Sequence, residues 1–427
     1  MTALIKKEQL LLSSGICVIF LFFTGAGHCF EYRFGGEIFE GLFKEMNYID
    51  YSDETIGTFN YDERYNILGV YPEFYVKTES GVSGYFQGEL EWTHSWDAWD
   101  KKDKDDIDGE VAIAYISYFA AGGSADIGIL PFRICNGLIL YSNEPGVTFE
   151  YNGSGDAYVK GNSFLVFDKS PMASFSLGYR PGFLETIELV GAWFNDGDDR
   201  IADLFDPGDT SFDVKSSGNL FWIGGDVNLF IHDFFVSCLM LHQFGSVKID
   251  YNSGSQDHDL SSYLIDVEIN YNIDHQLSAG AFMFLSSGDR HPMQGDINAF
   301  ISPIPYNERT VIFFNGGFER YDIEESVSLG GVTWAGVIAP GLEFDYQPTS
   351  KIITEFVFAM IFPEGDLFNS DTWYGWEADA SLIYEFFPNY NLFAQADIFG
   401  HGNFIKQVQG VRPDPAYRFA LGCSLIF

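Results

Sequence analysis

Basic residues are scarce in this chain. Its 427 residues include 23 lysines and arginines against 61 aspartates and glutamates, which gives a formal net charge of −38 at pH 7. A protein that binds nucleic acid needs a basic surface for the phosphate groups, so this balance excludes nucleic acid as a partner. Where the acidic residues lie along the chain therefore says more about function than their total.

Cysteine is also rare. Of five Cys residues, Cys17 and Cys29 lie near the N-terminus, which leaves Cys135, Cys238 and Cys423. These three are odd in number and do not have the spacing of a metal site. Cys238 and Cys423 sit in apolar runs, so we interpret them as small hydrophobic residues. No metal and no other cofactor is expected.

Motifs of known enzyme classes are missing. The sequence has no G-x-S-x-G, H-E-x-x-H or P-loop pattern, and its eight histidines are scattered. A hydrolase built into a barrel could still assemble a triad around His242 or His275, because triads are defined by geometry. We predict that the protein is not an enzyme and keep this hydrolase as an alternative.

Long hydrophobic runs occur only at the N-terminus. Lys6 and Lys7 precede the apolar stretch 10–23, and small residues follow at 24–29, as in a cleaved secretory signal. We therefore predict a signal peptide at 1–29 and one domain at 30–427. Removing two lysines and one glutamate with the signal changes the net charge from −38 to −39. After residue 29 no run of about 18 apolar residues appears, so no transmembrane helix is expected.

Aromatic residues and glycine are abundant instead, with 43 Phe, 24 Tyr and 45 Gly. Outer-membrane barrels need this mixture for aromatic girdles and curved strands. At the C-terminus, every second residue from Tyr417 to Phe427 is apolar, as expected for a strand with one apolar face. The ending on Phe427 resembles the closing strand of bacterial outer-membrane β-barrels. That resemblance implies that Phe427 is part of the signal read by the barrel assembly machinery.

The same alternation recurs along the whole chain. Short turns such as 79–81 and 388–390 alternate with long acidic connections, as in barrels with short periplasmic turns and long external loops. The long connections are expected at about 44–64, 95–108, 195–217, 247–259, 287–331, 363–372 and 401–415. The strands are expected near 31–43, 65–78, 82–95, 109–120, 125–133, 145–152, 156–167, 172–180, 183–194, 218–230, 234–246, 260–271, 275–286, 332–346, 351–362, 373–387, 391–400 and 416–427.

The even count and the final strand ending on the periplasmic side are both requirements of a single-chain barrel. We predict an all-β transmembrane antiparallel β-barrel of about 18 strands, within a range of 16 to 20. A secreted sandwich or propeller also uses alternating strands. It would, however, expose as ordinary surface the strongly charged face that a barrel turns toward its lumen.

That charged face is predominantly acidic. A carboxylate-lined pore attracts cations and repels anions, so we predict cation preference, although the carboxylates could instead merely hydrate a wide lumen. The predicted lumen-lining residues are Glu73, Glu89, Glu91, Glu188, Asp226, Asp266, Glu268, Glu343, Asp345, Glu355, Glu377, Asp379, Asp397 and Arg418. Glu37, Arg33, Lys77 and Lys160 are expected on the same face.

The stretch 127–147 is the candidate pore constriction. It is expected to leave its strand at Pro131 and to return at Pro145, with Arg133, Gly137 and Leu138 at the narrow point. Arg133 would reach across the pore or pair with a lumen carboxylate for stability. The 287–331 connection could narrow the lumen further.

The same stretch carries a family resemblance. Gly128-x-x-Pro131-Phe132-Arg133, then Gly137-Leu138, then Pro145-Gly146-Val147 resembles the alginate-export family of outer-membrane proteins. The resemblance implies an eighteen-stranded porin-like barrel and a monomer. Ile129 and Leu130 stand where that family commonly has Arg-Gln, and alginate is a polyanion, so an acidic lumen argues against alginate as the substrate.

Together these observations predict an outer-membrane channel for passive passage of small solutes or saccharides. Its partners would be outer-membrane lipids, the barrel assembly machinery and the solute. The alternative is a structural or adhesive surface barrel with a closed lumen.

Overall fold

A computed structural model describes most of the chain after the predicted signal peptide. The described residues are 30–48, 61–97, 102–120, 122–153, 155–166, 169–181, 185–197, 201, 215–251, 254–289, 295–303, 309–314, 335–365, 372–404 and 414–427. The predicted signal peptide at 1–29 lies outside them.

These residues form eighteen strands, each antiparallel to its neighbours. The strands are β1 (Phe30–Tyr48), β2 (Tyr61–Thr78), β3 (Val82–Asp97), β4 (Lys102–Ala120), β5 (Gly123–Ile134), β6 (Leu140–Asn152), β7 (Ala157–Val166), β8 (Ser170–Tyr179), β9 (Thr186–Asp196), β10 (Lys215–Ile231), β11 (Phe234–Tyr251), β12 (Gly254–Asn272), β13 (Leu277–Ser286), β14 (Val337–Thr349), β15 (Ile352–Ile361), β16 (Gly375–Phe387), β17 (Tyr390–His401) and β18 (Ala416–Ile426).

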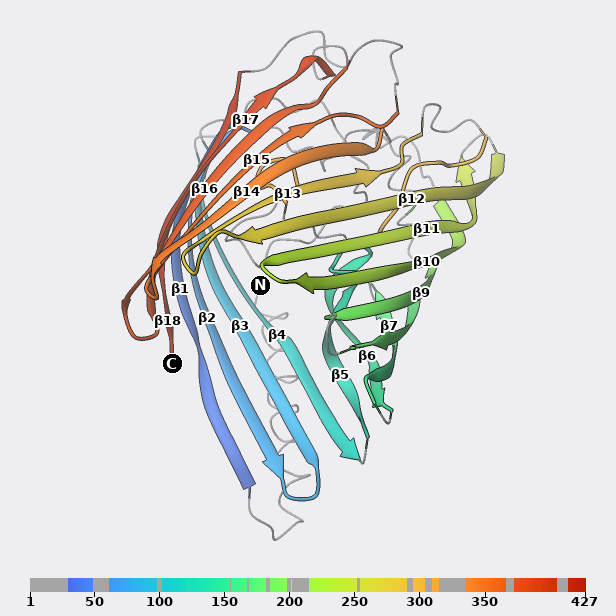
Figure 1. Ribbon diagram of the computed structural model, residues 1–427, viewed down its shortest axis with the longest axis horizontal. Helices are drawn as coiled ribbons and strands as arrows, with labels where there is room; N and C mark the ends of the chain where they lie inside the picture. The colour runs from blue at the N-terminus through green and yellow to red at the C-terminus, as the bar shows by residue number, and fades with distance from the viewer. Residues whose placement is uncertain are drawn as a thin grey trace.

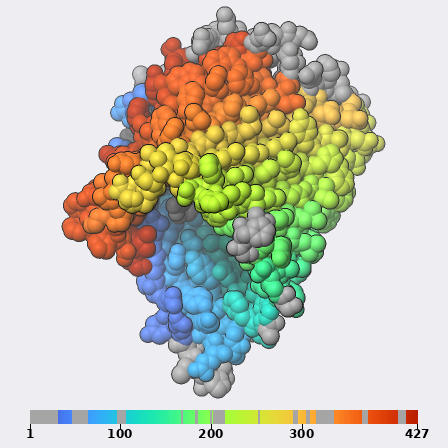
Figure 2. All heavy atoms as spheres, in the orientation of Figure 1, coloured from blue at the N-terminus to red at the C-terminus, as the bar shows by residue number. Residues whose placement is uncertain are grey.

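Pairing of the first strand with the last closes the sheet. β1 pairs with β2 on one side and with β18 on the other, so the strands run side by side around a central space (Figure 1). In Figure 2 the surface is hollowed between the blue N-terminal strands and the yellow-green strands from the middle of the chain. The predicted fold class and the predicted count of eighteen are confirmed.

Alternation along each strand decides which residues face outward. On β1, Tyr32 and Phe34 are strongly exposed, whereas Phe43 and Glu45 are buried and have the opposite parity. Large exposed hydrophobic residues recur in this way on strands all round the barrel. The outer surface therefore suits a lipid environment, and the polar side chains are directed inward. No helix among the described residues is long and apolar enough to cross a membrane.

Two expected loops are strand instead. The predicted loops at 95–108 and 247–259 are wrong, because β3 pairs with β4 up to Asp97 and β11 pairs with β12 up to Tyr251. Val247 and Ile249 are buried on the inner face of what the sequence suggested was a loop. Polar residues on the other face concealed the strand, since strands that extend beyond the lipid no longer need an apolar outer face.

The strand pairing agrees with the expected departure from the barrel wall at Pro131 and return at Pro145, although the two arms stay paired with each other as a hairpin. β6 pairs with β7 only from Gly146 onward, and β5 pairs with β6 up to Ile134 but with β4 only up to Ile129. Beyond that point β5 is bonded on one side only. A proline is tolerated there because its missing N–H can face the unpaired edge.

The last residue completes the closure. Gly36 N–H donates to Phe427 O at 3.0 Å, Phe427 N–H donates to Gly36 O at 2.9 Å, and the Phe427 ring lies 6.0 Å from that of Phe34. Phe427 thus extends the seam between β1 and β18 by one residue pair. Its role as an assembly signal stays a prediction.

Deleting Phe427 should weaken the seam. Loss of two backbone hydrogen bonds is expected to lower the free energy of unfolding by about 1–3 kcal/mol. Phe427→Leu keeps both bonds and should have a smaller effect. Urea unfolding of the refolded barrel in lipid vesicles measures the difference. Equal losses for the deletion and the leucine variant would contradict the assigned role of the backbone bonds.

Candidate functional site

The inner wall of the barrel gathers the predicted carboxylates. All fourteen acidic residues expected on the inner face, Glu37 included, and Arg418 occupy strand positions with the inward parity, as judged from the exposed hydrophobic residues that alternate with them. Several have specific partners. Tyr71 donates a hydrogen bond to Glu91, Tyr158 donates to Glu188, and Ser278 donates to Asp345 Oδ2 at 2.9 Å.

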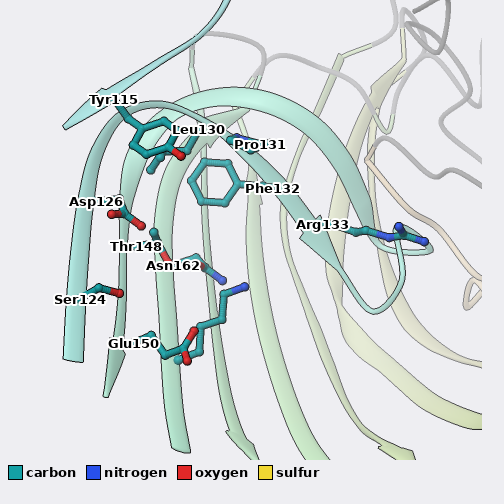
Figure 3. A pocket seen from close by; sticks show the side chains of 11 residues that line it. Tyr115, Ser124, Asp126, Leu130, Pro131, Phe132, Arg133, Thr148, Glu150 and Asn162 are labelled. Atoms are coloured by element: carbon teal, nitrogen blue, oxygen red, sulfur yellow. Dashed lines mark hydrogen bonds between the residues drawn. The ribbon is translucent and has the colours of Figure 1, made fainter. Parts of the chain in front are cut away.

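Arg133 lies on the hairpin 130–145, which has no described sheet partner on either flank. Its guanidinium lies 5.9 Å from the ring of Tyr141 on the other arm, and it lines a cavity together with the inward residues Asp126 and Thr148. In Figure 3 the Arg133 side chain points away from Phe132 and the other residues at the inner wall. Leu130, Phe132 and Ile134 pack into the apolar cluster on the inner wall, so the opposite face of this hairpin, which carries Arg133, is turned away from the wall. The role of Arg133 at a constriction stays a prediction.

Gly137 and Leu138 do lie inside. They belong to the tight turn 135–139 between β5 and β6, where Gly137 has a φ of 92° that favours glycine. Leu138 is buried, and its carbonyl accepts a hydrogen bond from Ser302 Oγ at 2.6 Å. The neighbouring Cys135 packs against the apolar cluster, and burial raises the pKa of its thiol.

Ser302 belongs to a segment that folds into the barrel. We call residues 295–303 and 309–314, from the connection between β13 and β14, the inner loop. The fully buried Gln243 side chain on β11 holds the first part: its Nε2 donates to Ile301 O at 2.8 Å and its Oε1 accepts from Ile301 N at 2.9 Å. Together with the 135–139 turn, the inner loop packs into one apolar cluster. This cluster lies in the half of the barrel where the long connections join the strands, which we call the long-loop half. This position is consistent with the prediction that the 287–331 connection narrows the lumen of the barrel.

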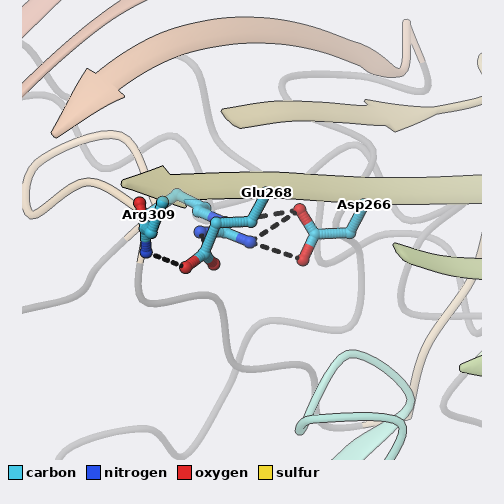
Figure 4. A network of polar contacts seen from close by, with 4 residues as sticks. Asp266, Glu268 and Arg309 are labelled. Carbon is cyan, nitrogen blue, oxygen red and sulfur yellow. Dashed lines mark hydrogen bonds and ion pairs between the residues drawn. The ribbon is translucent and has the colours of Figure 1, made fainter. Parts of the chain in front are cut away.

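An arginine anchors the second part of the inner loop to β12. Arg309 Nη2 lies 2.9 Å from Asp266 Oδ2, and Nη1 lies 2.6 Å from Glu268 Oε2 (Figure 4). All three side chains are less than 20% exposed, with relative exposures of 15%, 13% and 19%. Burial works against the charged guanidinium, yet Asp266 and Glu268 outweigh it and raise the pKa of Arg309. We call this contact of Arg309 with Asp266 and Glu268 the arginine clasp. It consists of charge-assisted hydrogen bonds, which are stronger than hydrogen bonds between neutral groups.

The other end of the inner loop is held from β16. Backbone N–H groups of Ile312 and Phe313 donate to the Glu377 carboxylate, the latter at 3.0 Å, and Val311 N–H donates to Asp379 Oδ2 at 3.3 Å. Glu377 has no exposed surface. The inner loop is thus suspended between carboxylates on β12 and on β16, and these four predicted lumen residues are structural anchors.

A further row of charges crosses the seam. Asp397 on β17 is the cross-strand neighbour of Arg418 on β18, which is in turn the neighbour of Glu45 on β1. Arg418 is 1% exposed, and its Nε lies 3.3 Å from Glu45 Oε1. Arg418 therefore balances acidic neighbours across the strands that close the barrel.

Sequence reasoning missed Gln243, Glu45 and Arg309 as members of the site. Arg309 left one usable signal, since it is a basic residue in the middle of a long connection within a very acidic chain. In the described part of the chain no group of three or more His, Cys, Asp or Glu side chains could hold a metal ion.

A closed eighteen-stranded barrel with a loop folded into it defines the class: the chain has the fold of outer-membrane porins. It is similar to two Pseudomonas aeruginosa proteins of known structure. They are OccK5 (OpdH), at 10% identity and a TM-score of 0.55 over 93% of this chain and 98% of the other, and the outer membrane protein OpdK, at 11% identity and 0.55 over 93% and 99%. OpdK solved with vanillate matches at 10% identity and 0.53 over 93% and 98%.

The sequence matches no protein-family model and no curated protein. The structural likeness shows the fold of outer-membrane porins, and the resemblance to the alginate-export family stays a prediction.

Removing the arginine clasp should loosen the inner loop. Arg309→Ala leaves Asp266 and Glu268 buried without their cation, so the free energy of unfolding should fall by about 1–3 kcal/mol. The exposed pair Lys248–Asp250, 3.1 Å apart, provides a matched control. Lys248→Ala should cost less than about 1 kcal/mol, because an exposed pair is solvated.

Urea unfolding gives the energies, and hydrogen exchange at Val311, Ile312 and Phe313 reports the inner loop directly. Exchange at these amides should rise in Arg309→Ala and stay unchanged in Lys248→Ala. Protection that survives the loss of Arg309 would show that the clasp does not hold the inner loop.

Proposed function

We propose that the chain is a passive outer-membrane channel for small neutral or cationic solutes. The observation that carries this proposal is the acidic inner wall of a closed barrel, where an inner loop occupies the long-loop half. Carboxylates in a confined aqueous space raise the local concentration of cations and disfavour anions.

The porin neighbours support a small-solute channel. One of them is OpdK with vanillate, which is a small organic anion. By likeness of fold we propose that small organic solutes also pass through this barrel, with the charge preference set by its own wall. Export of alginate is not proposed, because that polymer is a polyanion.

The wider assignment follows from the same fold. We propose residues 1–29 as a signal peptide, a location in the bacterial outer membrane, and Phe427 as the residue that the assembly machinery reads. No enzymatic step is assigned to the barrel.

A closed barrel with a structural or adhesive role is the second candidate. The dense packing of the inner loop favours it, since Phe300, Ile301 and Ile312 are almost completely buried. Such a barrel would pass no current. Its ligand contacts would then lie on the long connections.

Neutralising wall carboxylates that do not hold the inner loop tests the channel. A combined Glu73→Gln, Asp345→Asn and Glu355→Gln variant should lower cation preference, because three inward charges are lost while the β12 and β16 anchors remain. The reversal potential in planar bilayers under a salt gradient measures this preference.

The matched control removes three acidic residues from the exposed short turns. Glu79→Gln, Asp156→Asn and Asp233→Asn should change the reversal potential much less, since charges outside the pore are screened over about 10 Å at 0.1 M salt. Equal shifts in both triple variants would contradict selectivity by the inner wall.

A further inference from the structure

The inner wall contains a second feature, away from the inner loop. A cavity of about 200 Å³ lies against β4, β5, β6 and β7 (Figure 3). Its floor follows one cross-strand row, from Tyr115 through Gly128 and Gly146 to Phe164. Because Gly128 and Gly146 have no side chains, the wall is recessed between the rings of Tyr115 and Phe164. A Cβ at Gly146 would lie 2.5 Å from Phe164 Cβ, so the recess cannot be filled without moving its wall.

The upper edge of the cavity is aromatic. Phe132 is 4% exposed and stacks on Phe164 with ring centroids 4.0 Å apart. Tyr115 is half-buried, and its ring lies 5.5 Å from that of Tyr85 on the next strand. The cavity therefore presents rigid, pre-placed aromatic surface rather than flexible apolar side chains.

The lower edge is polar and carries donors and acceptors. Asp126, Thr148 and Asn162 are cross-strand neighbours; Thr148 Oγ1 donates to Asn162 Oδ1 at 2.6 Å. Asn162 Nδ2 donates to Ser174 Oγ at 2.8 Å, which fixes the orientation of the amide. The next row toward the short turns holds Ser124, Glu150 and Lys160.

The cavity lies on the short-turn side of the constriction. Along β5, Ile134 and the turn 135–139 come first, followed by Phe132 and Leu130 in the apolar cluster, and then Asp126 and Ser124 toward the short turn. A solute that had passed the inner loop would meet this wall next.

We propose that this cavity is a binding subsite for a neutral pyranose sugar, and this assignment rests on the proposed channel function. A pyranose ring has an apolar C–H face for the Tyr115 and Phe132 side and hydroxyl groups for Asp126, Thr148 and Asn162. Aromatic surface beside several converging polar groups suits a ligand that has one apolar face and many hydroxyl groups. The lining holds two carboxylates, Asp126 and Glu150, and two cations, Arg133 and Lys160. Their formal charges cancel, so the cavity favours a neutral ligand over an organic anion or cation.

The probe is glucose, and the protein is the complete folded barrel in detergent micelles. Saturation-transfer NMR should show saturable glucose binding that Tyr115→Leu and, independently, Thr148→Val weaken at least about fivefold. Tyr75→Leu is the matched control, because Tyr75 is an inward tyrosine two strands away from Tyr115 and outside the cavity lining. It should bind glucose as the unchanged protein does.

Three results would overturn the subsite: absence of glucose binding to the unchanged protein, equal weakening by Tyr75→Leu, or tighter binding of choline or glucuronate than of glucose. Bilayer current measured in parallel separates the two proposals. Glucose binding without any current would refute the channel and keep the subsite. Normal current without glucose binding would refute the subsite and keep the channel.

Discussion

Backbone hydrogen bonding is the constraint on which this structure depends. A strand surrounded by lipid must have both edges paired, since no water is present to bond its N–H and C=O groups. The chain meets this requirement by pairing β1 with β18, and Phe427 adds the last pair of bonds to Gly36. Closure of the barrel fixes which residues of each strand face inward and which face outward. Because the acidic residues occupy inward positions, they form the acidic inner wall.

Charge inside the barrel has two physical uses. Asp266 and Glu268 hold Arg309, and Glu377 and Asp379 hold backbone amides of the inner loop. Buried carboxylates are costly unless they gain such partners. Other inward carboxylates, such as Glu73 and Asp345, have no described contact with the inner loop and contribute to the electric field inside the barrel. Anchoring and selectivity are therefore assigned to different members of one acidic wall.

Much of the fold could be predicted from period-two alternation. The number of strands, their order along the chain and the inward side of residues such as Glu73 and Asp397 all follow from it. The lengths of the loops could not be predicted in this way, because β3, β4, β11 and β12 extend as strands whose outer residues are polar. The departure of the chain from the barrel wall at Pro131 followed from the proline, but the pairing of the two departing arms with each other did not, because their partners face each other across a turn. The contacts of Arg309 join residues more than 40 positions apart, and local patterns do not encode such pairs.

The reversal potential of the unchanged protein tests the central claim most directly. The mature chain, residues 30–427, would be reconstituted in a planar bilayer with different salt concentrations on the two sides. An acidic conduit predicts steady conductance and a zero-current potential of the sign given by cations moving down their gradient. A potential of the opposite sign, or a barrel that passes no current, would contradict it.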